Sequence, residues 1–187
     1  MAVPPDCRNL VGVKALRLAL ATALLVATGF LTASALATSH SEKNLGSLNR
    51  QVLVAVNSFR AAHGLAALRE SAALDRSARQ HSKEMGRDGY FAHSSHDGTV
   101  FWRRIRRYYT AKGYSYWSVG ENLVWESPSL SAGAAMKLWI ASPPHLANLL
   151  SKQWRQIGVS AVGVAHAPGV YGGRHVVIVT TDFGVRR

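Results

Sequence analysis

Three short segments of the chain each combine a side chain able to bind a metal or carry a proton with residues that favour turns or helix starts. The side chains are His93, Glu121 and His145. They lie in the segments Gly-Tyr-Phe-Ala-His, Gly-Glu-Asn-Leu and Ser-Pro-Pro-His. Two imidazoles and one carboxylate with an open fourth position suit Zn²⁺ or another divalent cation. We therefore predict that the three side chains share a cleft with a metal site.

The last of these segments predicts the start of a helix. Ser142 suits the N-cap and Pro143 the first helical position, which places His145 in the first turn. The positive end of the helix dipole disfavours a protonated imidazole there. Because a neutral imidazole is the form that binds metals, we expect His145 to be a competent ligand.

The other two side chains sit where a cleft could reach them. Glu121 follows Gly120, which lets the backbone bend or be approached closely. His93 lies between Phe91 and a polar turn at 94–98, at the border of core and solvent. An alternative is that each is a hydrogen-bonded structural group, since no dense signature such as His-Glu-x-x-His occurs.

The N-terminus resembles a secretory signal. An uncharged apolar run at 18–31 is followed by the small residues Ala35 and Ala37, and basic residues precede it: Arg8, Lys14 and Arg17. A retained membrane anchor is the alternative, but the run is short of the roughly 20 apolar residues that a span needs. We predict cleavage before Thr38 and a secreted protein, extracellular or periplasmic, with no stable membrane span.

The composition of the mature chain points to one domain held by its core. Cys7 is the only cysteine and precedes the apolar run, so residues 38–187 have no disulfide. Loss of the signal leaves 19 Lys and Arg against 9 Asp and Glu, a net charge of +10. Such an excess favours an anionic neighbour, such as acidic lipid headgroups or a cell-envelope polymer, without indicating a specific nucleic acid.

Periodicity predicts helices followed by a hairpin. Apolar spacing indicates helices near 47–63, 71–85, 99–109, 131–140 and 145–150, the third capped by Thr99. Segments rich in β-branched residues at 157–164 and 175–183 predict an antiparallel hairpin, with a further strand near 119–125. We predict an α+β fold, a three-layer α/β/α sandwich, with a signal at 1–37, a flexible lead at 38–46 and one domain at 47–187.

Four arginines at 103, 104, 106 and 107 alternate with aromatic residues in the third predicted helix. A nucleic-acid or membrane-surface role is one interpretation. We favour a solvated helix face above a buried aromatic stripe, because no other basic run of that density extends the footprint.

Taken together, these segments and several others resemble the CAP superfamily, the cysteine-rich secretory, antigen 5 and pathogenesis-related 1 group, in its cysteine-free bacterial branch. The resemblance runs in order from about Leu48 to Gly184. It rests on these motifs: Asn57-x-x-Arg60-x-x-His63-Gly64-Leu65, Tyr90-Phe91-Ala92-His93-Ser94, Gly120-Glu121-Asn122-Leu123-Val124-Trp125, Trp139-x-x-Ser142-Pro143-Pro144-His145-x-x-Asn148, Ile157-Gly158-Val159 and Thr181-Asp182-Phe183-Gly184.

The resemblance implies an α/β/α sandwich whose open cleft is lined by two His and two Glu and holds a divalent ion in some members. His93 matches the first family histidine and Glu121 the glutamate of the Gly-Glu-Asn motif. His145 matches the second histidine, 13 residues before Gly158.

The second glutamate is a departure from the family pattern. Ser142 stands three residues after Trp139, where the glutamate is expected, and Glu126 is a candidate substitute.

A fold of this kind is a scaffold, so function has to come from the site. The leading hypothesis is a secreted, non-catalytic binding module whose cleft takes a divalent cation and whose apolar surfaces take a lipid or cell-envelope ligand. Candidates for such surfaces, with core packing as the alternative, are Trp102, Trp117, Trp125 and Trp154. The second hypothesis is a hydrolase, using either Ser94 or Ser95 with His93 and Glu121, or a metal-activated water.

Overall fold

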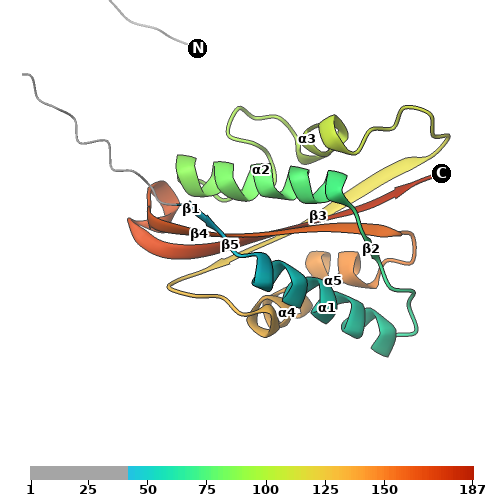
Figure 1. The fold of residues 1–187 in the computed structure, drawn as a ribbon, viewed down its shortest axis with the longest axis horizontal. Helices are drawn as coiled ribbons and strands as arrows, with labels where there is room; N and C mark the ends of the chain where they lie inside the picture. Colours follow the sequence, from blue (N-terminus) through green and yellow to red (C-terminus); the bar gives the residue numbers. More distant parts are fainter. Residues whose placement is uncertain (1–41) are drawn as a thin grey trace, which may run out of the picture. The chain divides into compact units, whose positions relative to one another are not determined.

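The structure is a computed structural model and describes residues 42–187 (Figure 1). The predicted signal at 1–37 and its cleavage site lie outside the described residues. Within these residues one sheet has the strand order β1 (Glu42–Asn44), β4 (Gln156–Ala167), β5 (Arg174–Arg186) and β3 (Trp117–Glu126), and β2 (Arg69–Glu70) pairs in parallel with β4. The other pairings are antiparallel, including the predicted hairpin of β4 and β5.

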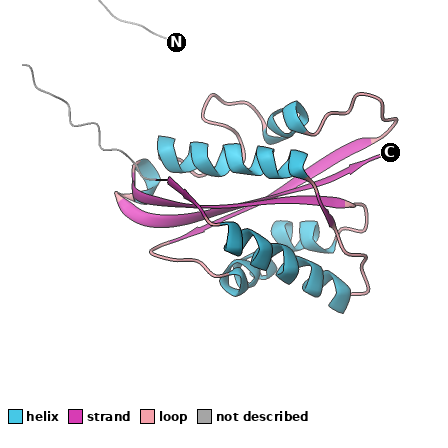
Figure 2. Ribbon diagram, viewed as in Figure 1, coloured by secondary structure: helices cyan, strands magenta, loops and turns pink. Residues whose placement is uncertain are grey.

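Helices cover both faces of this sheet (Figure 2). One layer contains α2 (Ala72–Asp88) and α3 (Phe101–Tyr108), and the other contains α1 (Gly46–Ala62), α4 (Ala132–Ala141) and α5 (Pro143–Leu150). The predicted α+β fold, arranged as an α/β/α sandwich, is therefore confirmed.

The two hairpin strands read as continuous apolar runs because both of their faces are buried. In β4, Ile157, Val159 and Ala161 join the core on the side of α1 and α4, whereas Val162 and Val164 pack with Met85 of α2. At Gly158 a Cβ atom would lie 2.1 Å from the carbonyl carbon of Leu74, so α2 rests directly on the strand backbone. Three core clusters lie within the described residues, and residues Thr38–Arg187 form one compact unit.

Two local predictions were wrong. Residues 42–44, predicted to be part of a flexible lead, form β1, and Glu42 pairs with Val164 at the far edge of the sheet. The third helix has Val100 rather than Thr99 at its N-cap, because the backbone N–H of Thr99 donates to the carboxylate of Asp97 in the preceding turn.

In the part of the chain that the structure describes, none of the helices has the length and apolar character needed to cross a bilayer.

Candidate functional site

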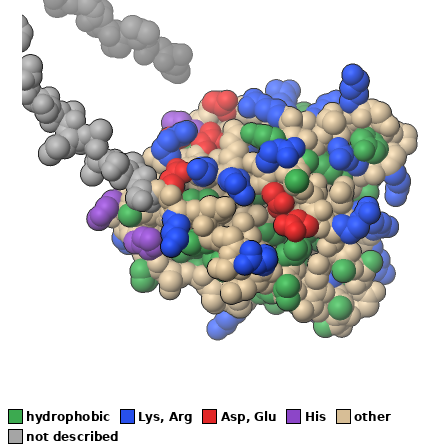
Figure 3. Space-filling view, viewed as in Figure 1, with side chains coloured by type: hydrophobic (Ala, Val, Ile, Leu, Met, Phe, Trp, Pro, Cys, Tyr) green, Lys and Arg blue, Asp and Glu red, His purple; other side chains and the backbone are tan. Residues whose placement is uncertain are grey.

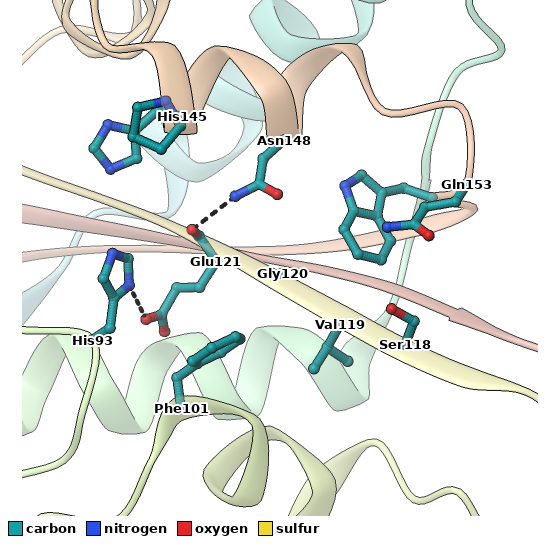
Figure 4. A pocket seen from close by; sticks show the side chains of 11 residues that line it. His93, Phe101, Ser118, Val119, Gly120, Glu121, His145, Asn148 and Gln153 are labelled. Atoms are coloured by element: carbon teal, nitrogen blue, oxygen red, sulfur yellow. Dashed lines mark hydrogen bonds and ion pairs between the residues drawn. The ribbon is translucent and has the colours of Figure 1, made fainter.

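The three predicted site residues lie together in one cleft at the open edge of β3 (Figure 4). This strand ends the sheet, so its outer side has no strand neighbour among the described residues. The cleft has a volume of about 480 Å³. His93 enters it from the loop after α2, Glu121 from β3 and His145 from the first turn of α5. The structure thus joins side chains from both helical layers across the sheet edge.

Two asparagines fasten α5 to the edge strand. Asn148 donates from Nδ2 to the carbonyl oxygen of Glu121 at 3.1 Å and to Oδ1 of Asn122 at 2.8 Å. Asn122 donates in turn to the carbonyl oxygen of His145 at 3.1 Å. At Gly120 a Cβ atom would lie 2.8 Å from the Trp154 ring and 2.9 Å from Oδ1 of Asn148, so only glycine permits this approach. The family motif residues therefore fix where His145 stands.

A buried ion pair sets the position of Glu121. Glu121 is 4 % exposed. Its Oε2 atom pairs with the guanidinium of the fully buried Arg104, and its Oε1 atom lies 2.8 Å from Nδ1 of His93. Arg104 also donates from Nη1 to the carbonyl oxygen of His93 at 2.9 Å. Burial alone would raise the pKa of Glu121, but the hydrogen bond from His93 and the charge of Arg104 outweigh burial and hold that pKa below its ordinary value.

Arg104 corrects the interpretation of the arginine cluster. It was assigned to a solvated helix face, yet its side chain is fully buried. It lies three residues after Phe101 and one before Ile105, which places it on the inward face at helical spacing. Arg103, Arg106 and Arg107 are exposed as expected.

The two histidines face each other across the cleft, with ring centroids 6.4 Å apart. Because the ionised Glu121 accepts from Nδ1 of His93, the Nε2 atom of that ring is left to carry a lone pair when the imidazole is neutral. Burial, and then the neighbouring His93, lower the pKa of His145. The neutral form is therefore favoured, as expected, although through burial and not through the helix dipole.

These groups fit a cation site of two imidazoles better than one of three protein ligands. Both carboxylate oxygens of Glu121 are engaged, so Glu121 stands behind His93, in the position of a carboxylate that orients a ligating histidine. Within residues 42–187 no group of three or more His, Cys, Asp or Glu side chains is gathered closely enough to hold a metal. The remaining positions of a cation there would fall to water or a ligand.

Glu126, the candidate substitute for the second glutamate, lies outside the cleft lining at the end of β3. It lines a neighbouring groove of about 280 Å³ together with Ser142, and that groove also reaches His145. Most of the groove is apolar, with these side chains: Phe91, Leu123, Val124, Trp125, Leu138 and Trp139. Cleft and groove therefore meet at His145.

Behind Glu121 lies a second carboxyl group that the sequence did not single out for the site. Asp182 is directly opposite Glu121 on β5 and is fully buried. Neither of its side-chain oxygens has a hydrogen-bond partner among the described residues. Burial, and next the charge of Glu121, raise the pKa of Asp182 well above its ordinary value, which favours its protonated form beside Glu121.

The geometry does not favour the hydrolase alternative. Ser95 is buried, and its hydroxyl lies 3.4 Å from Nη1 of Arg104, which makes it part of the support for the loop. The only carboxylate among the residues that line the cleft, Glu121, has both oxygens occupied and is not placed to act as a base toward a water.

The fold and site thus define a class, an α/β/α sandwich with a histidine-bearing cleft at its sheet edge. The sequence profile of the family described as CAP, cysteine-rich secretory protein family, matches residues 53–180, and the chain belongs to this family. A comparison with curated proteins finds no match.

Solved structures of bacterial proteins share the fold. An extracellular protein of Bacillus anthracis with an SCP domain is 27 % identical, with a TM-score of 0.58 over 76 % of this chain and 41 % of that one. An outer surface protein of Borrelia burgdorferi is 17 % identical, with a TM-score of 0.64 over 79 % of this chain and 99 % of that one. A cysteine-rich secretory protein of Staphylococcus aureus is 14 % identical, with a TM-score of 0.54 over 74 % of this chain and 38 % of that one. This chain thus spans less than half of the first and third proteins, and the second and third show similarity of fold alone.

Replacing Arg104 by Met should cost about 3–5 kcal/mol of unfolding free energy, because it leaves the buried carboxylate of Glu121 without its guanidinium. Adding Glu121→Gln to that variant should restore part of the loss. The exposed neighbour Arg103 provides the control, since Arg103→Met should stay within about 0.5 kcal/mol. Guanidinium denaturation of residues 38–187 measures the unfolding free energy of wild type and of the three variants. Equal losses for Arg104→Met and Arg103→Met would contradict the role of the ion pair.

The raised pKa of Asp182 predicts how stability depends on pH. The folded state keeps this proton to a higher pH than the unfolded chain, so the stability contributed by Asp182 is lost as pH rises above the ordinary aspartate range. Asp182→Asn does not titrate, so its unfolding free energy relative to wild type should improve between pH ~4 and ~7. Asp97→Asn should show the opposite trend at lower pH, below about pH 4, because a backbone hydrogen bond from Thr99 lowers the pKa of Asp97. A difference between Asp182→Asn and wild type that is flat with pH would count against the protonated carboxyl.

Proposed function

We propose that this protein is a secreted, non-catalytic binding module of the CAP family whose cleft holds a divalent cation between His93 and His145. The observation that carries the proposal is the locked arrangement behind the histidines. A buried arginine fixes Glu121, Glu121 fixes the ring of His93, and the asparagine pair fixes the helix that carries His145. Such preorganisation is what a binding site for a small ion requires.

A cation bound there would supply a Lewis-acidic point for a carboxylate or phosphate oxygen of a ligand. The residues of the chain keep the two imidazoles in the form that binds a cation. Glu121 keeps the Nε2 atom of His93 available, and the desolvated His145 stays neutral near neutral pH. Zn²⁺ is the preferred candidate because imidazole ligands suit it, although other divalent ions share this chemistry.

The apolar groove beside the cleft supports a ligand with an apolar part, such as a lipid. Phe91 and Leu138, which line it, are 38 % and 42 % exposed, so apolar surface is already presented to solvent there. Because the groove and the cleft share His145, one ligand could place its polar end at the cation and its chain along the groove.

Secretion is supported by the similar proteins, one described as extracellular and one as an outer surface protein. With the apolar N-terminal run, this favours an extracellular or periplasmic site of action.

Calorimetric titration of residues 38–187 with Zn²⁺ tests the cation site. Wild type should bind one ion, His93→Ala and His145→Ala should each lose the binding, and Glu121→Gln should weaken it about 10–100-fold because the ring of His93 is no longer held. The exposed His175 on β5 is the matched control, so His175→Ala should bind like wild type. Absence of binding, or binding indifferent to both cleft variants, would overturn the cation site.

Binding of a fluorescent fatty acid tests the groove separately. Phe91→Ser and Leu138→Ser should each weaken it by about 1 kcal/mol, because each removes apolar surface from the groove. The control is Val54→Ser on α1, which removes an exposed apolar side chain from a different surface. Equal effects of the three changes would exclude the groove as the apolar site.

A further inference from the structure

The outer face of α2 carries a stripe of basic side chains. Apart from Ala72 at its start, every exposed residue of this helix is basic: Arg76, Arg79, Lys83 and Arg87. They are spaced by three or four residues, which aligns them along one side of a helix. The sequence does not show a run here, because buried residues separate the charges.

The neighbouring α3 extends this stripe into a surface. Its exposed residues are Trp102, Arg103, Arg106 and Arg107. The two helices lie in the same layer, and the hydroxyl of Tyr108 joins them by donating to Oε1 of Gln80 at 2.8 Å. Figure 3 shows Lys and Arg side chains over this layer, with Asp and Glu side chains among them and further Lys and Arg elsewhere on the same face. We call the seven basic residues and Trp102 the α2/α3 surface.

Most of the basic residues on this surface form no direct ion pair. Lys83 pairs with Glu42 at 3.0 Å and Arg87 with Asp88 at 2.7 Å. The other five basic residues have no ion pair within residues 42–187: Arg76, Arg79, Arg103, Arg106 and Arg107. The opposite layer differs, since the only exposed charged residues of α1, α4 and α5 are Arg50 and Lys137. Among the helices, the exposed basic residues are therefore concentrated on α2 and α3.

An aromatic side chain lies within the charge. Trp102 is 38 % exposed, and the guanidinium of Arg103 lies 5.2 Å from the centre of its ring. Val100, just before the helix, is 39 % exposed. Tryptophan beside arginine is the composition of surfaces that rest at a membrane interface, where the ring enters the headgroup region and the charges meet phosphates. A soluble polyanion would satisfy the arginines but offer no apolar phase for Trp102.

We propose that the α2/α3 surface docks on an anionic phospholipid bilayer, with Trp102 entering the headgroup region. This surface would fix the orientation of the protein on the membrane. It contains none of the cleft histidines, so the proposal does not depend on cation binding. Each basic residue near an anionic membrane surface strengthens binding by roughly fivefold, and three together by on the order of 100-fold.

Vesicle cosedimentation of residues 38–187, which form one compact unit, tests the proposal. The protein should partition onto phosphatidylcholine vesicles that contain phosphatidylglycerol and hardly at all onto phosphatidylcholine alone. The triple change Arg103→Gln, Arg106→Gln and Arg107→Gln should weaken partitioning on the order of 100-fold. The matched control removes the same charge from the other side of the sheet: Arg50→Gln, Lys137→Gln and Lys152→Gln. It should leave partitioning within a few-fold of wild type.

Two further variants distinguish an anionic bilayer from a soluble polyanion as the partner and test the contribution of α2. Trp102→Ala should lower partitioning onto anionic vesicles and leave binding to polyphosphate, a soluble polyanion, unchanged. The change Arg76→Gln with Arg79→Gln should weaken vesicle binding, which shows that α2 shares the surface. Equal losses for the two triple variants would indicate diffuse charge and overturn the surface. Indifference of vesicle binding to Trp102→Ala would overturn the membrane and leave a soluble polyanion as the partner. All of these side chains are exposed, and unchanged thermal unfolding confirms that the variants are folded.

Discussion

The buried ion pair between Arg104 and Glu121 is the constraint on which the site depends. Both side chains are almost completely removed from solvent, where an unpaired charge would be far more costly than in water. The pair joins α3 to β3, and through the carbonyl oxygen of His93 it also fixes the loop after α2. One interaction thus ties three segments, distant in sequence, to a single geometry. Burial and the charge of Glu121 favour the protonated form of Asp182 beside the pair, which limits the negative charge there.

The cleft exists because β3 is an edge strand with a helical layer on each side. The ion pair organises the layer of α2 and α3, which brings His93, while the asparagine pair organises the layer of α5, which brings His145. The strand between them supplies Glu121, so neither layer alone could form the site. On the outside of α3 the same helix presents its arginines to solvent. A short helix therefore serves the cleft with its inner face and an external surface with its outer face.

Much of this arrangement could be predicted from the sequence. Segments rich in β-branched residues identified the hairpin, and the Ser-Pro-Pro-His segment identified the start of α5. The convergence of His93, Glu121 and His145 was predicted from residue type and from the order of the family motifs. Arg104 was missed because an arginine in an arginine-rich helix suggests solvent, although its spacing from Phe101 and Ile105 placed it inward. The basic stripe of α2 was missed because helical geometry, rather than adjacency, unites its charges. The strand β1 has a polar sequence, and only its pairing with β4 makes it a strand.

The most direct test of the account is the tautomer of His93, read from the ¹⁵N and ¹H resonances of its imidazole in residues 38–187 at a pH where the ring is neutral. If the Arg104–Glu121 pair holds this ring, His93 should be observed in the form that carries its hydrogen on Nδ1, with Nε2 unprotonated. The tautomer should also stay fixed while the exposed His175 shows the averaged signals of a free side chain. A neutral His93 ring with its hydrogen on Nε2, or one averaging between the two forms like His175, would contradict the claim that the ion pair positions the cleft.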